Sequence, residues 1–301
     1  AHMALRHCGR RWLSSAGTFV PQHTWVSKTK ELDPSKKLVF FLHGILGSGR
    51  NWTSFARLLE KNHPQWQAVL VDLRNHGSSL NPPTPHTIHT SALDIQALAD
   101  HLGQAPEAVC GHSFGGKVAL SYLGLAKHPP RKVWLLDSQV GSVQSESSSG
   151  VRQVIDSMKA VSMPVNTRNE LLDQLRALGL SESLCQWQTT NLIRTASGHG
   201  YTWLFDFDAI DEMFADYQHC NLWHLLDEIP AQSSVSLVKA EKGITWDPED
   251  WNRFVHLAST RSNVDWDLIP DASHWLHTDK PLAVMASLSQ WFRDGAWRQS
   301  F

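Results

Sequence analysis

The order of apolar and amphipathic segments between residues 37 and 137 constrains the fold of this chain more than any other feature. Short apolar runs recur there, each ended by a glycine loop or an aspartate: KLVFFLH (37–43), QAVLVD (67–72), EAVCG (107–111) and KVWLLD (132–137). Such runs are typical of strands that are buried on both faces. Segments with apolar residues at helical spacing lie between them, around Trp52–Leu59, over Ser91–Leu102 and over Phe114–Ala126. This alternation predicts a mainly parallel sheet flanked by helices on both faces.

The alternation stops after Asp137. A stretch rich in Ser and Gly (138–150) is followed by helical periodicity from residue 151 to about 228, with one short extended piece near residues 201–207. Strand-like runs then return, and a final amphipathic helix begins near Pro281. The two late strand-like runs are SVSLVKA (234–240) and VDWDLIP (264–270).

These segments predict one α/β domain that is interrupted by a helical block after the strand ending at Asp137. The predicted ranges are residues 19–140 for the first part of the core, 141–229 for the helical block and 230–301 for the second part of the core.

The composition narrows the classes of function. The chain has 301 residues and a formal net charge of -2, which gives no reason to expect nucleic acid or an anionic membrane as a partner. No apolar run approaches the roughly 20 residues of a membrane-spanning helix. The four cysteines have no metal-ligand spacing, so we predict no metal site and favour a reducing compartment. We expect most of the 14 tryptophans to fill the core, with an aromatic pocket as the alternative.

The first residues differ from the rest of the chain. Ala1 and His2 before Met3 are typical of a tag remnant, and the segment from Met3 to Lys30 contains Arg and Lys but no acidic residue. A basic, Ser-containing leader is typical of an organelle transit peptide, and a plain basic tail is the alternative. We therefore predict a tag remnant and transit peptide over residues 1–18 and a mitochondrial location, with chloroplast or cytoplasm as alternatives.

The stretch GHSFG (111–115) indicates a nucleophile. It follows an apolar run and precedes a helical segment, and a sharp turn from strand to helix would lift the Ser113 hydroxyl above the carboxyl edge of the sheet. Gly111 and Gly115 have no side chains, which at these positions would collide with neighbouring elements. The positive end of the helix favours negative charge that develops at this place.

A serine hydroxyl needs a base, and the base needs a carboxylate that orients it. His274 in DASHWLH follows the last predicted strand at the same sheet edge, and His277 is the competing candidate. Asp137 ends the strand after the nucleophile strand and is the acid we favour. The rival acids follow SVSLVKA, where Gly243 occupies the expected position; they are Glu241, Asp247 and Asp250.

An oxyanion hole would complete the site. The residue after the nucleophile, Phe114, supplies one backbone N–H, and the loop HGILGS (43–48) supplies the other from Ile45. Glycines in that loop allow the backbone to approach the serine closely.

Together these motifs resemble the α/β-hydrolase superfamily, and more narrowly a branch of small esterases found in bacteria and mitochondria. The matching stretches are HGILGS (43–48), DLRNHGSS (72–79), GHSFGGK (111–117), LLDSQVG (135–141) and SHWLHTDKP (273–281). The resemblance covers about residues 37–292 and implies an α/β-hydrolase fold with a lid formed by the helical block. It also implies triad roles for Ser113, Asp137 and His274.

The chain departs from the pattern of that branch at three places. Phe114 replaces a methionine, DSQVG replaces an acid-Ile-x-Pro sequence, and Ser273 replaces the glycine before the histidine. None of these changes removes a chemical group that the reaction needs.

We predict a serine hydrolase, a carboxylesterase or thioesterase, that acts through an acyl-enzyme on a small or medium apolar acyl ester and needs no cofactor. The alternatives are a ligand- or partner-binding protein on a hydrolase scaffold, or an acyltransferase. The residues expected to line the substrate pocket are His43, Trp187, Trp203 and Trp275. His43 and His112 lie in motif turns, where local hydrogen bonds are expected.

Overall fold

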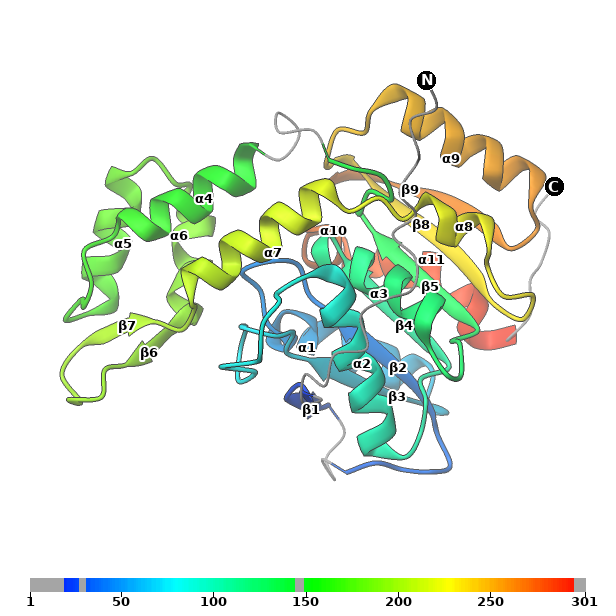
Figure 1. Cartoon of the computed structure of the whole chain (residues 1–301), viewed down its shortest axis with the longest axis horizontal. Helices are drawn as coiled ribbons and strands as arrows, with labels where there is room; N and C mark the ends of the chain where they lie inside the picture. Colours follow the sequence, from blue (N-terminus) through cyan, green and yellow to red (C-terminus); the bar gives the residue numbers. More distant parts are fainter. Residues whose placement is uncertain (1–18, 27–30, 144–148, 295–301) are drawn as a thin grey trace, which may run out of the picture.

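The computed structural model describes residues 19–26, 31–143 and 149–294, so the predicted transit peptide (1–18) lies outside the described residues. Within them a seven-stranded sheet has the order β1-β3-β2-β4-β5-β8-β9 (Figure 1). Neighbouring strands are parallel except for the pair β1–β3. The strands are β1 (His23–Trp25), β2 (Lys37–Leu42), β3 (Trp66–Val71), β4 (Ala108–His112), β5 (Lys132–Leu136), β8 (Ser234–Lys242) and β9 (Val264–Ser273).

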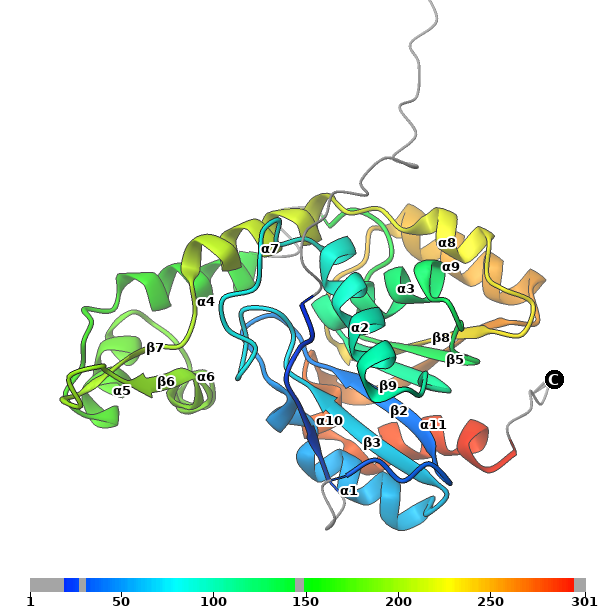
Figure 2. The ribbon, with the colours of Figure 1, turned by 60° about the horizontal axis from the view of Figure 1, so that its bottom comes forward.

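Two layers of helices cover the sheet because its central strands are apolar on both faces. Along β2, Leu38, Phe40 and Leu42 belong to one buried cluster, whereas Val39 and Phe41 belong to the other. The first face is covered by α2 (Ile88–Leu102), α3 (Phe114–Leu125), α8 (Trp223–Asp227) and α9 (Pro248–Thr260). The second is covered by η1 (Gly49–Trp52), α1 (Thr53–Asn62), α10 (Leu276–Asp279) and α11 (Pro281–Asp294), as Figure 2 shows. The predicted parallel sheet between helical layers is confirmed.

A helical segment, here called the insert (residues 149–219), leaves the core after β5 and extends to one side of it (Figure 1). Its short strands β6 and β7 pair antiparallel, and β7 is the extended piece expected near residues 201–207. The elements of the insert are α4 (Ser149–Ala160), α5 (Arg168–Ala177), α6 (Glu182–Gln188), η2 (Thr189–Asn191), β6 (Leu192–Arg194), β7 (Tyr201–Trp203) and α7 (Phe207–His219). After α7 the chain returns to the core, where α8 packs on α3.

Helix α7 connects the insert to the core through its carboxylates. Glu212 accepts a hydrogen bond from the backbone N–H of His86 at 2.9 Å, and Asp216 accepts one from Ile88 at 2.7 Å, at the start of α2. Asp211 on the same helix pairs with Arg152 of α4 at 2.7 Å. The insert is therefore held to the core by specific polar contacts as well as by apolar packing.

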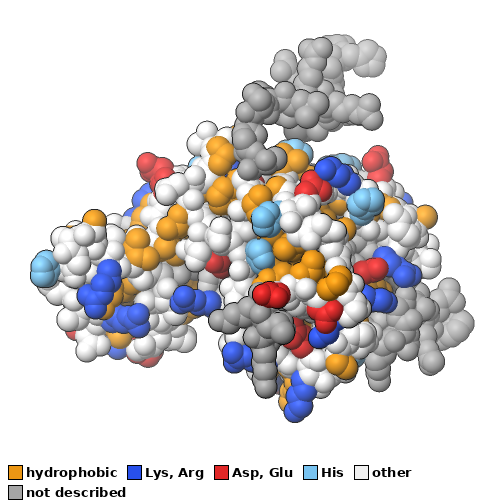
Figure 3. Space-filling model, turned by 90° about the horizontal axis from the view of Figure 1, so that it is seen from below, with side chains coloured by type: hydrophobic (Ala, Val, Ile, Leu, Met, Phe, Trp, Pro, Cys, Tyr) orange, Lys and Arg blue, Asp and Glu red, His pale blue; other side chains and the backbone are white. Residues whose placement is uncertain are grey.

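The positions of the tryptophans and of the charged side chains fit the expectations from the composition. Trp52, Trp66 and Trp134 are among the largest fully buried side chains, as expected for tryptophans that fill a core. The face seen in Figure 3 carries charged side chains of both signs. Among the described helices, none combines the length and the apolar character that crossing a membrane requires.

Candidate active site

Ser113 lies at the turn between β4 and α3, in a backbone conformation that few residues adopt. Its φ is 52° and its ψ is -116°, which stores strain at the point where the strand becomes a helix. A side chain at Gly115 would come within 2.6 Å of the backbone oxygens of Leu42 and His43, and one at Gly111 within 2.1 Å of the Gly115 oxygen. The two glycines therefore allow the turn to fit against the neighbouring strand.

Asp137 and His274 meet at the same edge of the sheet. Asp137 follows β5 directly, and its Oδ2 accepts a hydrogen bond from His274 Nδ1 at 2.8 Å. The carboxylate is fully buried and also accepts backbone N–H bonds from Ala240 at 3.1 Å and Ile244 at 3.0 Å. These donors hold the carboxylate in one orientation and leave Nε2 of His274 as the unprotonated nitrogen.

Gly243 explains why the later loop carries no acid at its expected position. A side chain there would lie 2.1 Å from an oxygen of Asp137. The space that an acid from this loop would occupy is thus filled by the carboxylate of Asp137. Of the rivals, Asp247 instead caps α9 and Asp250 accepts a hydrogen bond from the Trp223 indole at 2.9 Å.

Two further histidines surround His274. His112 Nε2 donates to the backbone oxygen of His274 at 2.8 Å and so supports its position. His277, the competing base in the sequence, stacks on Trp52 with ring centroids 4.2 Å apart, and its Nδ1 is buried without a described partner. Burial lowers the pKa of His277 to about 3, so this imidazole stays neutral near pH 7.

Ile45, in the loop after β2, lines a small cavity together with Ser113 and Phe114. No described residue accepts a hydrogen bond from the N–H of Ile45 or from that of Phe114, the first residue of α3. Two such amides beside a serine can stabilise an oxyanion.

Leu46 holds this loop in place because both its backbone N–H and its backbone oxygen form hydrogen bonds with side chains. Leu46 donates its N–H to His76 Nε2 at 3.0 Å, and its oxygen accepts from the amide of Asn191 in the insert, also at 3.0 Å. The side chain of His43 also supports nearby backbone. Its Nε2 accepts a hydrogen bond from the Leu73 N–H at 3.0 Å, and its Nδ1 donates one to the Gly44 oxygen at 2.8 Å. Both ring nitrogens of His43 are thus engaged in supporting backbone.

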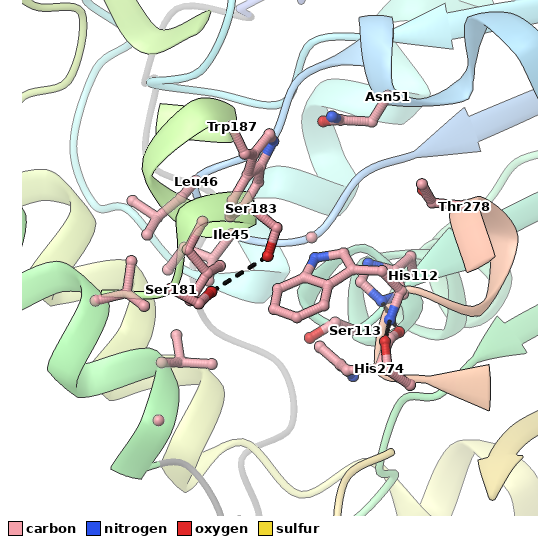
Figure 4. A pocket seen from close by; sticks show the side chains of 18 of the residues that line it. Ile45, Leu46, Asn51, His112, Ser113, Ser181, Ser183, Trp187, His274 and Thr278 are labelled. Carbon is pink, nitrogen blue, oxygen red and sulfur yellow. Dashed lines mark hydrogen bonds between the residues drawn. The ribbon is translucent and has the colours of Figure 1, made fainter. Parts of the chain in front are cut away.

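A cavity of about 560 Å³ opens between the core and the insert above these groups. Figure 4 shows Ser113 and His274 on the core side, with Ser181, Ser183 and Trp187 reaching in from the insert. His43, Trp187 and Trp275 line this cavity, and the rings of the two tryptophans approach to 6.0 Å. A second cavity of about 20 Å³ lies deeper, against Ser113, Phe114 and Tyr217.

Trp203 is the one predicted pocket residue that the structure keeps away from the cavity. It is 8% exposed, and its indole N–H donates to the Met158 oxygen at 3.0 Å. Its side chain therefore packs between elements of the insert, and it does not line either cavity.

The comparison with known proteins agrees with this geometry. A family model described as alpha/beta hydrolase fold matches residues 37–187. The chain belongs to this family. In alpha/beta hydrolases the nucleophile occupies a turn from strand to helix, which is where Ser113 lies here.

Several relatives of this alpha/beta hydrolase are named as lipases or esterases. The sn-1-specific diacylglycerol lipase ABHD11 of Mus musculus is 27% identical over 269 residues, which cover 85% of this chain and 81% of that protein. The esterase YbfF of Escherichia coli (strain K12) is 23% identical over 270 residues, covering 89% of this chain and 98% of that protein. Among solved structures, a marine microorganism esterase superposes with a TM-score of 0.76 at 22% identity, covering 91% of this chain and 99% of that one.

Three residues at this alpha/beta-hydrolase site carried no role in the sequence analysis. His76 was visible there only as part of the RNHG motif, although its contact with Leu46 supports the loop after β2. Asn191 and Tyr217 come from the insert, where helical periodicity alone gives no sign of which polar side chain reaches the core. Within the described residues, no cluster of three or more metal-binding side chains is present.

Proposed function

We propose that this protein is a serine hydrolase that cleaves carboxylic esters or thioesters through Ser113, His274 and Asp137. The observation that carries the proposal is the 2.8 Å contact between His274 Nδ1 and the buried Asp137 carboxylate, at a cavity that Ser113 also lines. A neutral imidazole held in this tautomer is the arrangement needed to activate a serine hydroxyl.

The reaction proceeds in two halves. His274 Nε2 takes the proton of Ser113 as the Oγ attacks the substrate carbonyl, and the N–H groups of Ile45 and Phe114 stabilise the resulting oxyanion. His274 then gives the proton to the departing alcohol or thiol, which leaves an acyl-enzyme. Water, deprotonated by the same imidazole, attacks the acyl carbon and releases the carboxylic acid. These steps need no metal and no organic cofactor.

The cavity favours an apolar substrate of small or medium size. Its volume of about 560 Å³ falls within the range for small-molecule pockets, and tryptophan, leucine and valine side chains form much of its wall. The lipase and esterase names of the relatives point in the same direction. The insert forms the outer wall of the cavity, which supports a role for it as the lid over the site.

Labelling with a fluorescent fluorophosphonate tests the proposal, because this probe reacts with activated serines. We expect the wild type to be labelled and to hydrolyse p-nitrophenyl esters, with both signals lost in Ser113→Ala. The exposed serine of the insert provides the control variant Ser162→Ala, which should keep both signals. Labelling that persists in Ser113→Ala, or its absence from folded wild type, would overturn the assignment.

A substrate panel separates the alternatives. Short- and long-chain p-nitrophenyl esters and acyl thioesters report hydrolysis, and added alcohols report acyl transfer through the ester product formed. A binding protein on the same scaffold would bind these esters without releasing acid.

We also propose that the protein is mitochondrial. The support is the basic, acid-free segment after Met3. A fusion of the full chain to a fluorescent protein should enter mitochondria, and removal of residues 3–18 should leave it in the cytoplasm. Unchanged location after this removal would contradict the proposal.

A further inference from the structure

Lys117 is a buried cation one turn of α3 beyond Ser113, and the mechanism above does not use it. Its side chain is 1% exposed although it belongs to the GHSFGGK motif at the active-site turn. Burial of an ammonium group is costly unless all its donors are satisfied. Lys117 meets this condition, because its Nζ donates to three backbone oxygens: Gly141 at 2.7 Å, Tyr217 at 2.8 Å and Cys220 at 2.7 Å.

The three acceptors lie on the two connections between the insert and the core. Gly141 is on the chain that leaves the core after β5, whereas Tyr217 and Cys220 are at the carboxyl end of α7 and just after it. The same connections are joined by backbone bonds, from Val143 to Gln218 at 2.8 Å and from Leu222 to Val140 at 3.0 Å. Lys117 therefore links the nucleophile helix to both connections at the place where they meet.

Lys117 keeps its charge near pH 7 although burial disfavours the charged form. Burial lowers the pKa of Lys117 to about 8, while the carboxylates of Asp216 from α7 and Asp250 from α9 oppose this decrease. The group is therefore mostly protonated at pH 7 and can supply all three donors. The negative end of the α7 dipole adds to the attraction.

Tyr217 connects this junction to the nucleophile. Its backbone oxygen binds Lys117, and its ring lies 4.7 Å from the lysine Nζ. The tyrosine is buried and lines the small cavity together with Ser113, which places its side chain near that serine. Burial raises its pKa, so the phenol is neutral and can hydrogen-bond to the serine oxygen.

We propose that Lys117 is a positioning residue that holds both connections of the insert to the nucleophile helix and thereby places the Tyr217 hydroxyl against Ser113. This inference rests on the proposed serine-hydrolase function. It means that the reactivity of Ser113 depends on how the insert is attached, and not only on His274 and Asp137.

A double-mutant cycle tests the link. Lys117→Met keeps the length of the side chain without its donors, and Tyr217→Phe removes the hydroxyl without the ring. The measured quantity is the second-order rate constant for labelling of Ser113 by the fluorophosphonate. In this reaction the serine oxygen attacks phosphorus and fluoride leaves, so the rate constant reports the reactivity of Ser113. We expect a decrease of about tenfold for Tyr217→Phe and a decrease of similar size, about tenfold, for Lys117→Met. Because the lysine acts through the tyrosine hydroxyl, the double variant should lose less than the product of the two single losses.

Lys132→Met is the matched control for general destabilisation. Lys132 is also buried, at the start of β5, and its Nζ bonds Ser236 at 2.5 Å. This variant should lose thermal stability while its labelling rate stays within about twofold of wild type. If Lys117→Met does not fold, Lys117→Arg replaces it, since a planar guanidinium keeps the charge but cannot direct three donors from one nitrogen.

Hydrogen exchange provides a second readout in the same variants. Lys117→Met should speed exchange of the Val143 and Leu222 amides, which join the two connections, and Tyr217→Phe should not. Losses in labelling rate that multiply across the cycle, or a Lys117→Met rate equal to that of Lys132→Met, would overturn the inference. Failure of the proposed function itself is distinguished by labelling that survives Ser113→Ala.

Discussion

Substitution of Asp137 by asparagine removes a charge from the centre of the site while leaving its shape. The carboxylate Oδ2 accepts two hydrogen bonds, from His274 Nδ1 at 2.8 Å and from the Ile244 N–H at 3.0 Å. An amide nitrogen at that position faces two donors. Rotation of the amide by half a turn would instead place the nitrogen against the Ala240 N–H, which now donates to Oδ1 at 3.1 Å. Every orientation of the amide thus leaves at least one donor without an acceptor.

The size of the effect follows from these contacts. Loss of a hydrogen bond to a charged group costs about 1.5–3 kcal/mol. Pairing with the amide nitrogen also favours the tautomer of His274 that is protonated on Nε2 and cannot take the serine proton, at a similar cost. Together these make about 3–6 kcal/mol, or roughly 10²–10⁴ in kcat. The unpaired backbone donor should lower the free energy of unfolding by about 1–3 kcal/mol.

The assay is steady-state hydrolysis of a p-nitrophenyl ester at pH 7 to 8, with folding checked by circular dichroism and thermal melting. Asp247→Asn is the matched control, because this former rival acid caps α9 and asparagine caps helices equally well. We expect kcat for Asp247→Asn within twofold of wild type. A folded Asp137→Asn enzyme with kcat reduced less than tenfold would refute the reasoning, and would move the acid to another residue.

Two other predictions follow from the histidines. His76→Phe deprives the Leu46 N–H of its acceptor, so we expect kcat to fall about ten- to hundredfold with KM changed less than threefold, since oxyanion contacts act in the transition state. Acid should destabilise the protein: burial lowers the pKa of His43 to about 4 and those of His76 and His277 to about 3. Below pH 6.5 the unfolded chain therefore binds more protons than the folded chain, so the free energy of unfolding decreases as the pH is lowered. At pH 4 the decrease is on the order of 3 kcal/mol per histidine. His277→Phe should therefore move the acid-unfolding midpoint, followed by tryptophan fluorescence, to lower pH; an unchanged midpoint would show that this histidine is not buried as described.

The central sheet and the strand-to-helix turn at Ser113 could be predicted from the sequence because local patterns encode them. Buried parallel strands are continuously apolar, and KLVFFLH and KVWLLD therefore predict β2 and β5 to within one residue. The strand-to-helix turn needs glycines at fixed offsets, which makes GHSFG informative in that context. The preference for Asp137 over the later acids rests on its place at the end of a strand and on Gly243 at the expected position in the later loop. The structure adds that a side chain at Gly243 would lie 2.1 Å from an oxygen of Asp137.

Other elements could not be predicted because their stability comes from distant contacts. Strand β1 has three residues and gains its hydrogen bonds by pairing with β3, about 45 residues later along the chain. Helix α9 was missed for a different reason, because its local start signal, Asp247 followed by Pro248, is present in the sequence and was not used. The contacts of Asn191 and Tyr217 depend on how the insert packs on the core, which helical periodicity cannot specify.

The position of Leu46 has a consequence for exchanging parts between members of this family. Its oxygen is held by an amide from the insert and its nitrogen by a histidine from the core. In a chimera, the corresponding segment of another family member would replace the insert. The hydrogen bond to the Leu46 oxygen would then be lost unless the new segment has an amide side chain at the position of Asn191. Exchange of the insert therefore also changes the support of the loop that we propose to hold the oxyanion, so the insert is not an independent module in this protein.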